Sequence, residues 1–243
     1  MNHLENIKAL LLDLDGVITQ TATIHSLAWK KMFDDYNQQL KSEGKETFEP
    51  MDIKKDYAEY LDGIPRYEGV DNFLKSREIE LPWGSPADEP GYNSVCALGN
   101  LKNGFFQKAL QEQEVEVYDD ALQMLKKWKQ ADIPMGIISS SKNCRPILES
   151  AGLTGYFDII IDGVYLEENS LDGKPAPDIF LEAAEKLGMK PEQCAVFEDA
   201  ISGVKAGSSG DFKLVIGVDR VGAADELKNN GADLVVQKLT QLA

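Results

Sequence analysis

Long apolar runs, cysteines and basic residues are all scarce in this sequence. No apolar stretch approaches the length that spans a membrane, so we expect no membrane partner and no signal peptide. The three cysteines, Cys96, Cys144 and Cys194, are widely spaced without a metal-binding pattern, which favours free thiols in a reducing, cytoplasmic compartment. Lys and Arg number 25 against 41 Asp and Glu, and the net charge of −16 disfavours nucleic acid as a partner. Any anionic substrate must therefore be held by a few local cations.

The distribution of apolar residues divides the 243-residue chain into two parts. Composition is that of a soluble globular protein, with 43% apolar and 27% charged residues, and neither repeats nor low-complexity tracts are present. The first apolar run, at 8–12, has the length of one buried strand. From 21 to 116 we predict no strand, only helices, over 24–41, 51–61, 68–77 and 95–114.

After residue 117, apolar runs alternate with helical patterns. We predict strands over 135–138, 158–161, 195–197, 214–218 and 233–236, and helices over 119–130, 146–151, 178–187 and 203–207. This alternation predicts an α/β fold, with a doubly wound, Rossmann-like parallel sheet formed by residues 1–20 and 117–243. An all-helical domain is inserted into it at 21–116. Such sheets bind ligands at the carboxyl ends of their strands.

An acidic pair, Asp13 and Asp15, follows the first predicted strand. In a strand, residues i and i+2 face the same side, so we expect the two carboxylates to project together. Close carboxylates raise one another's pKa unless a cation lies between them, and Mg²⁺ prefers such oxygen ligands. Taken alone, the pair also fits a strand that runs into an Asp-Gly turn.

Three further polar motifs follow predicted strands. They are Ser139-Ser140-Ser141, Lys174 between Gly173 and Pro175, and the acidic pair Glu198-Asp199. Each alone is more typical of a capped helix, a solvated lysine or a charged loop than of a functional site. Their joint order places an acidic pair, hydroxyls, an ammonium and more carboxylates at one edge of one sheet.

Four segments carry a resemblance to a known family. Asp-Leu-Asp-Gly-Val-Ile-Thr, Ser-Lys-Asn, Leu-Thr-Gly-Tyr-Phe-Asp and Lys-Pro-Ala-Pro-Asp-Ile-Phe resemble motifs of the haloacid dehalogenase superfamily of phosphatases and phosphomutases. The resemblance is strongest to the β-phosphoglucomutase branch and covers essentially the whole chain. It implies that Asp13 is the nucleophile that accepts the phosphoryl group and that Asp15 is the general acid and base. It further implies that Ser139, Ser140 and Lys174 bind the transferring phosphate.

The resemblance also implies a Mg²⁺ cofactor. Asp13, the backbone carbonyl of Asp15, and Asp199 would hold it, with Glu198 at or just outside the coordination shell. Phosphoryl transfer depends mainly on alignment and charge neutralisation, which Mg²⁺ and a lysine supply.

The inserted helices resemble the mobile cap of this family, which closes over the site and excludes water. Residues that match substrate-contacting positions of the branch are His25, Trp29, Arg66, Lys102, Asn103 and, in the core, Asn143. Several positions depart from the branch. They are Gln20, Asp62, Pro65 and Gly69, together with a longer segment at 76–93.

The function that we predict is Mg²⁺-dependent phosphoryl transfer on a sugar phosphate through an aspartyl phosphate, as in conversion of β-glucose 1-phosphate to glucose 6-phosphate. A sugar-phosphate phosphatase with the same site is the alternative, because only the group that attacks the aspartyl phosphate differs. A third alternative is a non-catalytic phosphosugar-binding protein, which has no need of a nucleophile. We expect a monomer.

Overall fold

The computed structural model describes residues 4–62, 64–112 and 115–242, and the chain forms two compact units. Residues 1–21 and 115–243 make up the first, here called the core unit. Residues 22–114 make up the second, here called the helical unit. The chain therefore leaves the core unit once and returns to it once.

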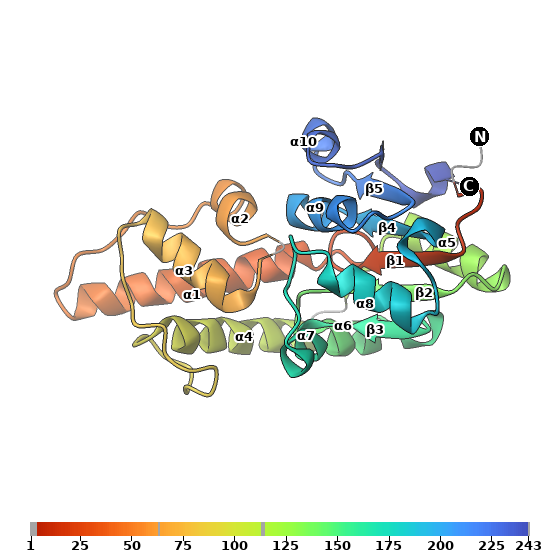
Figure 1. The fold of residues 1–243 in the computed structure, drawn as a ribbon. Coiled ribbons are helices and arrows are strands. Elements are labelled where there is room, and N and C mark those ends of the chain that lie inside the picture. Colours follow the sequence, from red (N-terminus) through yellow and green to blue (C-terminus); the bar gives the residue numbers. More distant parts are fainter. Residues whose placement is uncertain (1–3, 63, 113–114, 243) are drawn as a thin grey trace. The chain divides into compact units, whose positions relative to one another are not determined.

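The core unit contains one six-stranded parallel sheet (Figure 1). Its strands are β1 (Ala9–Asp13), β2 (Met135–Ile138), β3 (Ile159–Ile161), β4 (Cys194–Glu198), β5 (Leu214–Val218) and β6 (Leu234–Val236). They lie in the order β3-β2-β1-β4-β5-β6, so β1 is central and is flanked by β2 and β4. All five residues of β1 and of β4 are buried, as expected for strands covered on both faces. The predicted α/β doubly wound fold is confirmed.

Helices cover both faces of the sheet. They are α5 (Asp119–Gln130), α6 (Cys144–Ser150), α7 (Gly163–Asn169), α8 (Asp178–Lys186), α9 (Ile201–Ser209) and α10 (Ala224–Asn229), with short 3₁₀ turns at Thr154–Tyr156, Pro191–Gln193 and Leu239–Leu242. On one face, Leu11 and Val196 share a buried cluster with Phe180 of α8 and Val204 of α9. The other face is covered by α5, whose Trp128 ring lies 5.5 Å from that of Phe197. Side chains alternate along each strand, which is why neighbouring residues of β4 reach opposite layers.

The strand β1 ends at Asp13, so the prediction that one strand projects both Asp13 and Asp15 is wrong. Directly after Asp13 the chain turns, because Ile18 and Thr19 donate backbone hydrogen bonds to the carbonyl of Leu14. Gly16, at the bend, has a φ of +85°, a region that residues with a Cβ rarely adopt. Asp15 therefore belongs to a tight loop and not to the sheet.

The helix α7 was not predicted. Its seven residues show no clear apolar stripe, and only Gly163 and Leu166 are buried. Asp162 initiates it by accepting a hydrogen bond from the backbone N–H of Tyr165 at 2.9 Å, an N-cap that acts locally. The short helix α10 (Ala224–Asn229) was not predicted either, whereas the strands and the helices α5, α6, α8 and α9 lie within a few residues of their predicted bounds.

The helical unit consists of α1 (Ala22–Ser42), α2 (Lys55–Tyr60), α3 (Arg66–Ser76) and α4 (Val95–Glu112), and its described residues contain no strand. Its interior combines aliphatic with aromatic residues, and the rings of Phe33 and Phe73 stack there at 3.9 Å. The long segment before α4 is ordered by its own contacts. Asp88 accepts hydrogen bonds from the Ser94 hydroxyl at 2.7 Å and from the backbone N–H of Ser85 at 3.1 Å.

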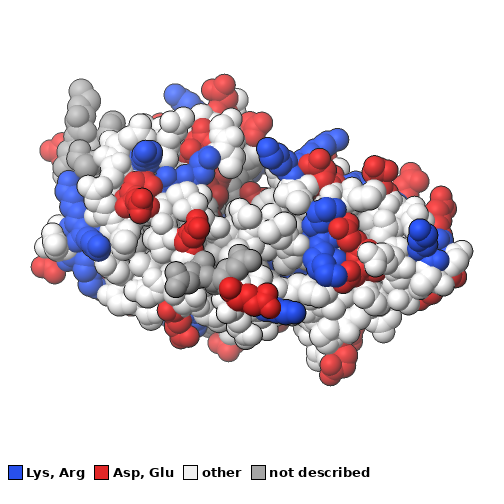
Figure 2. Space-filling model, turned by 180° about the vertical axis from the view of Figure 1, so that it is seen from behind, with Lys and Arg blue, Asp and Glu red and all other residues white. Residues whose placement is uncertain are grey.

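Surface charges of both signs are interspersed on the face shown in Figure 2. Some charged residues of the helical unit form local pairs one helical turn apart, such as Lys30 with Asp34 and Lys75 with Asp71. Such exposed pairs contribute little to stability. Within the described ranges, no helix combines the length and apolar character needed to cross a membrane.

Candidate active site

The carboxyl edge of the sheet gathers the polar residues that follow its central strands. Asp13 is the last residue of β1, Glu198 is the last residue of β4, and Ser139 directly follows β2. Register brings them together, because Asp13 pairs with Ile138 and Leu12 pairs with Phe197 on the two neighbouring strands. Three strands that are far apart in sequence thus end side by side at the carboxyl edge of the sheet.

Lys174 lies between two carboxylates at this edge. Its Nζ is 2.5 Å from Oδ1 of Asp13, and it also forms an ion pair with Glu198. The three side chains are almost fully buried, with exposed fractions of 3% for Lys174, 11% for Asp13 and 1% for Glu198. A buried charge is tolerated only when paired in this way, so the ammonium and the carboxylates stabilise one another.

Burial and charge act in opposite directions on the pKa of each member of this cluster. Burial raises the pKa of Asp13, and the Lys174 ammonium only partly reverses this effect. For Glu198, burial together with the nearby Asp13 carboxylate raises the pKa to about 7, despite the opposing effect of Lys174. Burial alone would lower the pKa of Lys174, but the two carboxylates outweigh it and raise the value. Lys174 is therefore a permanent cation at neutral pH.

A third carboxylate completes an acidic cluster. Asp13, Glu198 and Asp199 each offer an oxygen, and these oxygens lie within 4.8 Å of one another. The backbone of Gly16 packs directly against the Asp199 carboxylate, so that even a single Cβ at this position would collide with it. Oxygen donors at this spacing fit a hard divalent cation such as Mg²⁺. The side chain of Asp15 lies outside this cluster.

The Asp15 carboxylate is held by a hydroxyl at the end of the core unit. It accepts a hydrogen bond from the Thr21 hydroxyl, whose oxygen is also 3.0 Å from that of Thr19. Thr19 and Thr21 are both completely buried. Sequence reasoning did not single out these threonines, although their position directly after the acidic pair was a usable signal.

The loop after β2 presents hydroxyls and backbone groups. The hydroxyls of Ser139 and Ser141 accept hydrogen bonds at 3.1 Å from the backbone N–H groups of Ser141 and Asn143, respectively. The hydroxyl oxygen of Ser140 is buried and has no hydrogen-bond partner among the described residues. Buried polar atoms usually have a partner, so a ligand oxygen at this loop would satisfy it.

The residues predicted in the inserted helices form two groups within the helical unit. Lys102, only 3% exposed, has its Nζ 2.9 Å from Nδ1 of His25 and 4.8 Å from the ring centre of Trp29. Arg66 donates a hydrogen bond of 3.0 Å to Oδ1 of Asn103. Each group thus places a cation beside a polar or aromatic partner.

The side chain of His25 is half-buried, and its imidazole stacks on Phe106 at 4.0 Å. Burial, the Lys102 ammonium and Arg66 all disfavour the protonated ring, which lowers its pKa well below 6.5. Because Lys102 donates, the neutral ring accepts at Nδ1.

We expect His25 to stay neutral over the pH range in which an exposed histidine titrates. The chain has two histidines, so a His3→Gln variant leaves one imidazole, whose ring signals an NMR titration can follow. The unfolded chain takes up a proton on His25 near pH 6.5, whereas the folded chain does not. The free energy of unfolding should therefore decrease as the pH falls below about 6.5. Lys102→Met should raise the His25 pKa, and a normal value in the parent protein would contradict the packing described.

The chain is similar to known proteins over most of its length. Residues 7–211 match the family model described as haloacid dehalogenase-like hydrolase. A β-phosphoglucomutase of Mycobacterium bovis is 44% identical over 241 residues, which cover 98% of this chain and 92% of the relative. A fructose-1-phosphate phosphatase of Escherichia coli is 26% identical over 87% of this chain and 96% of its own length.

A solved structure is similar over nearly the whole chain. The crystal structure of β-phosphoglucomutase from Clostridium difficile has a TM-score of 0.76 and 29% sequence identity, and the match covers 98% of this chain and 93% of that one. Both the core unit and the helical unit are therefore present in this relative.

Proposed function

Because this chain belongs to the haloacid dehalogenase-like hydrolase family, and within it to the β-phosphoglucomutase-like branch, we propose that it isomerises a sugar phosphate by Mg²⁺-dependent phosphoryl transfer. The chain is an enzyme of the phosphomutase and phosphatase class. The reaction that we propose is conversion of β-glucose 1-phosphate to glucose 6-phosphate. The buried contact of Lys174 with Asp13 and Glu198 carries the proposal, because it places a cation beside the candidate nucleophile.

In this mechanism Asp13 attacks the phosphorus atom of the 1-phosphate of glucose 1,6-bisphosphate, and the bond from phosphorus to the sugar oxygen breaks, so that glucose 6-phosphate is the leaving group. Asp15 protonates the departing sugar oxygen, leaving an aspartyl phosphate on Asp13. The 6-hydroxyl of β-glucose 1-phosphate then attacks this intermediate while Asp15 accepts its proton, which regenerates glucose 1,6-bisphosphate. Lys174 and the hydroxyls of Ser139 and Ser140 hold the equatorial oxygens during both steps.

The acidic cluster would hold the metal ion. Asp13 and Asp199 are the ligands that we propose, with the backbone carbonyl of Asp15 and with Glu198 at or just outside the shell. When bound, Mg²⁺ supplies positive charge that offsets the charge on the transferring phosphoryl group. Lys174 supplies the second positive charge from the protein itself.

The second candidate function is a sugar-phosphate phosphatase, in which water attacks the aspartyl phosphate. The similarity to a fructose-1-phosphate phosphatase supports this alternative. A mutase must also hold the phosphate that is not being transferred, and Arg66 is the residue that we assign to it. Its planar guanidinium can grip phosphate through two hydrogen bonds.

We expect Arg66→Ala to reduce mutase activity by about 2–4 kcal/mol of transition-state binding, because a phosphate loses its charged partner. The assay supplies β-glucose 1-phosphate, Mg²⁺ and a catalytic amount of glucose bisphosphate, and it follows glucose 6-phosphate and free phosphate separately. A reaction in excess chelator is the blank. Release of phosphate from p-nitrophenyl phosphate should hardly change, since this substrate has no second phosphate.

Lys75→Ala is the matched control, because Lys75 lies on the same helix α3 and forms an exposed ion pair with Asp71. It should leave both activities unchanged. If free phosphate is the main product and Arg66→Ala has no effect, the phosphatase proposal replaces the mutase proposal.

A further inference from the structure

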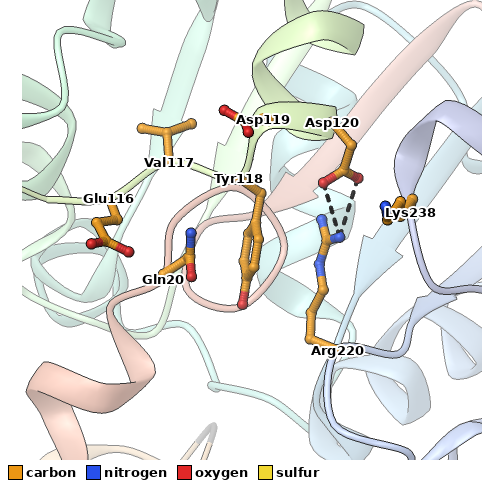
Figure 3. A pocket seen from close by; sticks show the side chains of 8 residues that line it. All are labelled: Gln20, Glu116, Val117, Tyr118, Asp119, Asp120, Arg220 and Lys238. Carbon is orange, nitrogen blue, oxygen red and sulfur yellow. Dashed lines mark hydrogen bonds and ion pairs between the residues drawn. The ribbon is translucent and has the colours of Figure 1, made fainter.

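Arg220, which directly follows Asp219 after the end of β5, lines a pocket of about 570 Å³ in the core unit (Figure 3). Its Nη1 donates to both carboxylate oxygens of Asp120, at 3.0 and 3.1 Å, and to the backbone carbonyl of Gln237 at 2.9 Å. The guanidinium carbon also lies 3.9 Å from the ring centre of Tyr118. The side chain is only 9% exposed although it borders an open pocket.

The other side of the same guanidinium binds the loop that carries Asp15. Nε donates to the carbonyl of Gly16 at 3.3 Å, and Nη2 donates to the carbonyl of Val17 at 3.1 Å. These are the carbonyl groups of the two residues directly after Asp15. A planar guanidinium holds both carbonyls in a fixed relation, which a flexible point charge cannot do.

We call Arg220 with its contacts to Asp120, Gly16 and Val17 the clamp. The loop that carries Arg220 and the side chain of Asp120 are each held by further hydrogen bonds. The Asp219 side chain accepts backbone hydrogen bonds from Val221, Gly222 and Ala223, at 3.1, 2.6 and 2.8 Å, which orders the loop beside Arg220. The Asp120 carboxylate, in the first turn of α5, also accepts the backbone N–H of Leu239 at 2.6 Å. Arg220 therefore joins the Asp15 loop to a rigid part of the core unit.

We propose that Arg220 is a positioning residue for Asp15. By fixing the carbonyls of Gly16 and Val17, it fixes the direction in which the loop presents the general acid. Sequence reasoning missed Arg220, but like the other site residues it follows the end of a strand. The inference rests on the proposed function, because it concerns the step in which Asp15 protonates the leaving sugar oxygen.

Two substrates separate this role from a merely structural one. A sugar oxygen must be protonated as it leaves, whereas nitrophenolate leaves without a proton. Misplacing Asp15 should therefore slow the first transfer from a sugar phosphate and spare the transfer from p-nitrophenyl phosphate. General loosening of the site would slow both alike.

The experiment measures single-turnover release of the leaving group, with enzyme in excess, from β-glucose 1,6-bisphosphate and from p-nitrophenyl phosphate. Arg220→Lys keeps the positive charge but removes the planar guanidinium that binds both carbonyls. We expect the ratio of the two rates to fall by about 10- to 100-fold, within the range that general acid catalysis and alignment contribute. The enzyme concentration that gives the half-maximal rate constant with the bisphosphate should change by less than about threefold, because no contact to the substrate is lost.

Arg77→Lys is the matched control. Arg77 also forms a largely buried ion pair, to Asp56 at 2.5 Å, and lies over an aromatic ring, Phe73, at 4.6 Å, but it belongs to the helical unit. The ratio of the two release rates should be the same in Arg77→Lys as in the wild type. If Arg220→Lys does not fold, judged by circular dichroism, Asp120→Asn weakens the same clamp and is scored by the same ratio.

An unchanged ratio, with or without an equal loss in both rates, would overturn the inference while the proposed function stands. If the wild-type protein releases neither leaving group, the proposed function fails and the inference fails with it. The two failures are therefore distinguishable.

Discussion

Asp13→Asn should lower turnover of any phosphate ester by at least about 10⁴-fold, because a neutral amide cannot attack phosphorus. The amide matches the carboxylate in shape, and Lys174 keeps its ion pair with Glu198, so the variant should remain folded. Mass spectrometry of protein quenched during turnover should find a phosphoryl adduct on Asp13 in the wild type only.

The control for this prediction is Asp158→Asn. Asp158 accepts a hydrogen bond from the backbone N–H of Met135, the first residue of β2, and so lies at the opposite edge of the sheet. Removing its charge should leave turnover within about twofold of wild type, as is usual away from a site. If Asp13→Asn kept more than about 1% of activity, the covalent mechanism would have to be abandoned.

Lys174→Met should have the largest combined effect on activity and stability. Turnover should fall by about 10²–10³-fold, because the transferring phosphate loses a fixed cation. In metal-free buffer near pH 8, the free energy of unfolding should fall by about 3–5 kcal/mol, since Asp13 and Glu198 remain buried without their counter-ion. Urea unfolding of both proteins measures the difference.

The pH dependence of this loss has a definite sign. Without the ammonium, the folded-state pKa values of Asp13 and Glu198 rise further above their unfolded values, so the folded variant binds more protons than the unfolded chain. The stability deficit should therefore shrink as the pH is lowered toward about 5 and grow as it is raised.

Lys142→Met provides the comparison. Lys142 forms an ion pair of 2.7 Å with Glu167, but the two side chains are 33% and 57% exposed. Exposed pairs contribute at most about 1 kcal/mol, so this variant should unfold almost like wild type at every pH. Equal losses in the two variants would show that the buried cluster is not the source of the effect.

The fold class could be predicted because its signal is local. Runs such as Ala9–Asp13 and Leu214–Val218 are almost wholly apolar, which is required of strands buried on both faces. Helical spacing at 22–42 and 95–112 likewise depends on residues close in sequence. The helix α7 escaped prediction because a single N-cap at Asp162 starts it and no apolar stripe marks it.

The placement of motifs at strand ends was also readable in the sequence. Asp13, Ser139 and Glu198 each stand where an apolar run stops, and parallel strands bring such ends to one edge. The roles assigned to these residues stay predictions until the variants above are measured.

What the sequence determined by itself is therefore the α/β core with its inserted helices and the edge at which the polar motifs meet. Only the tertiary structure decided how those motifs contact one another. It placed Asp15 in a loop beyond β1, set the Lys174 ammonium between Asp13 and Glu198, and brought Arg220 to the carbonyls of Gly16 and Val17. Burial patterns repeat over a few residues and are visible locally, whereas a contact between residues 16 and 220 exists only after the sheet has assembled.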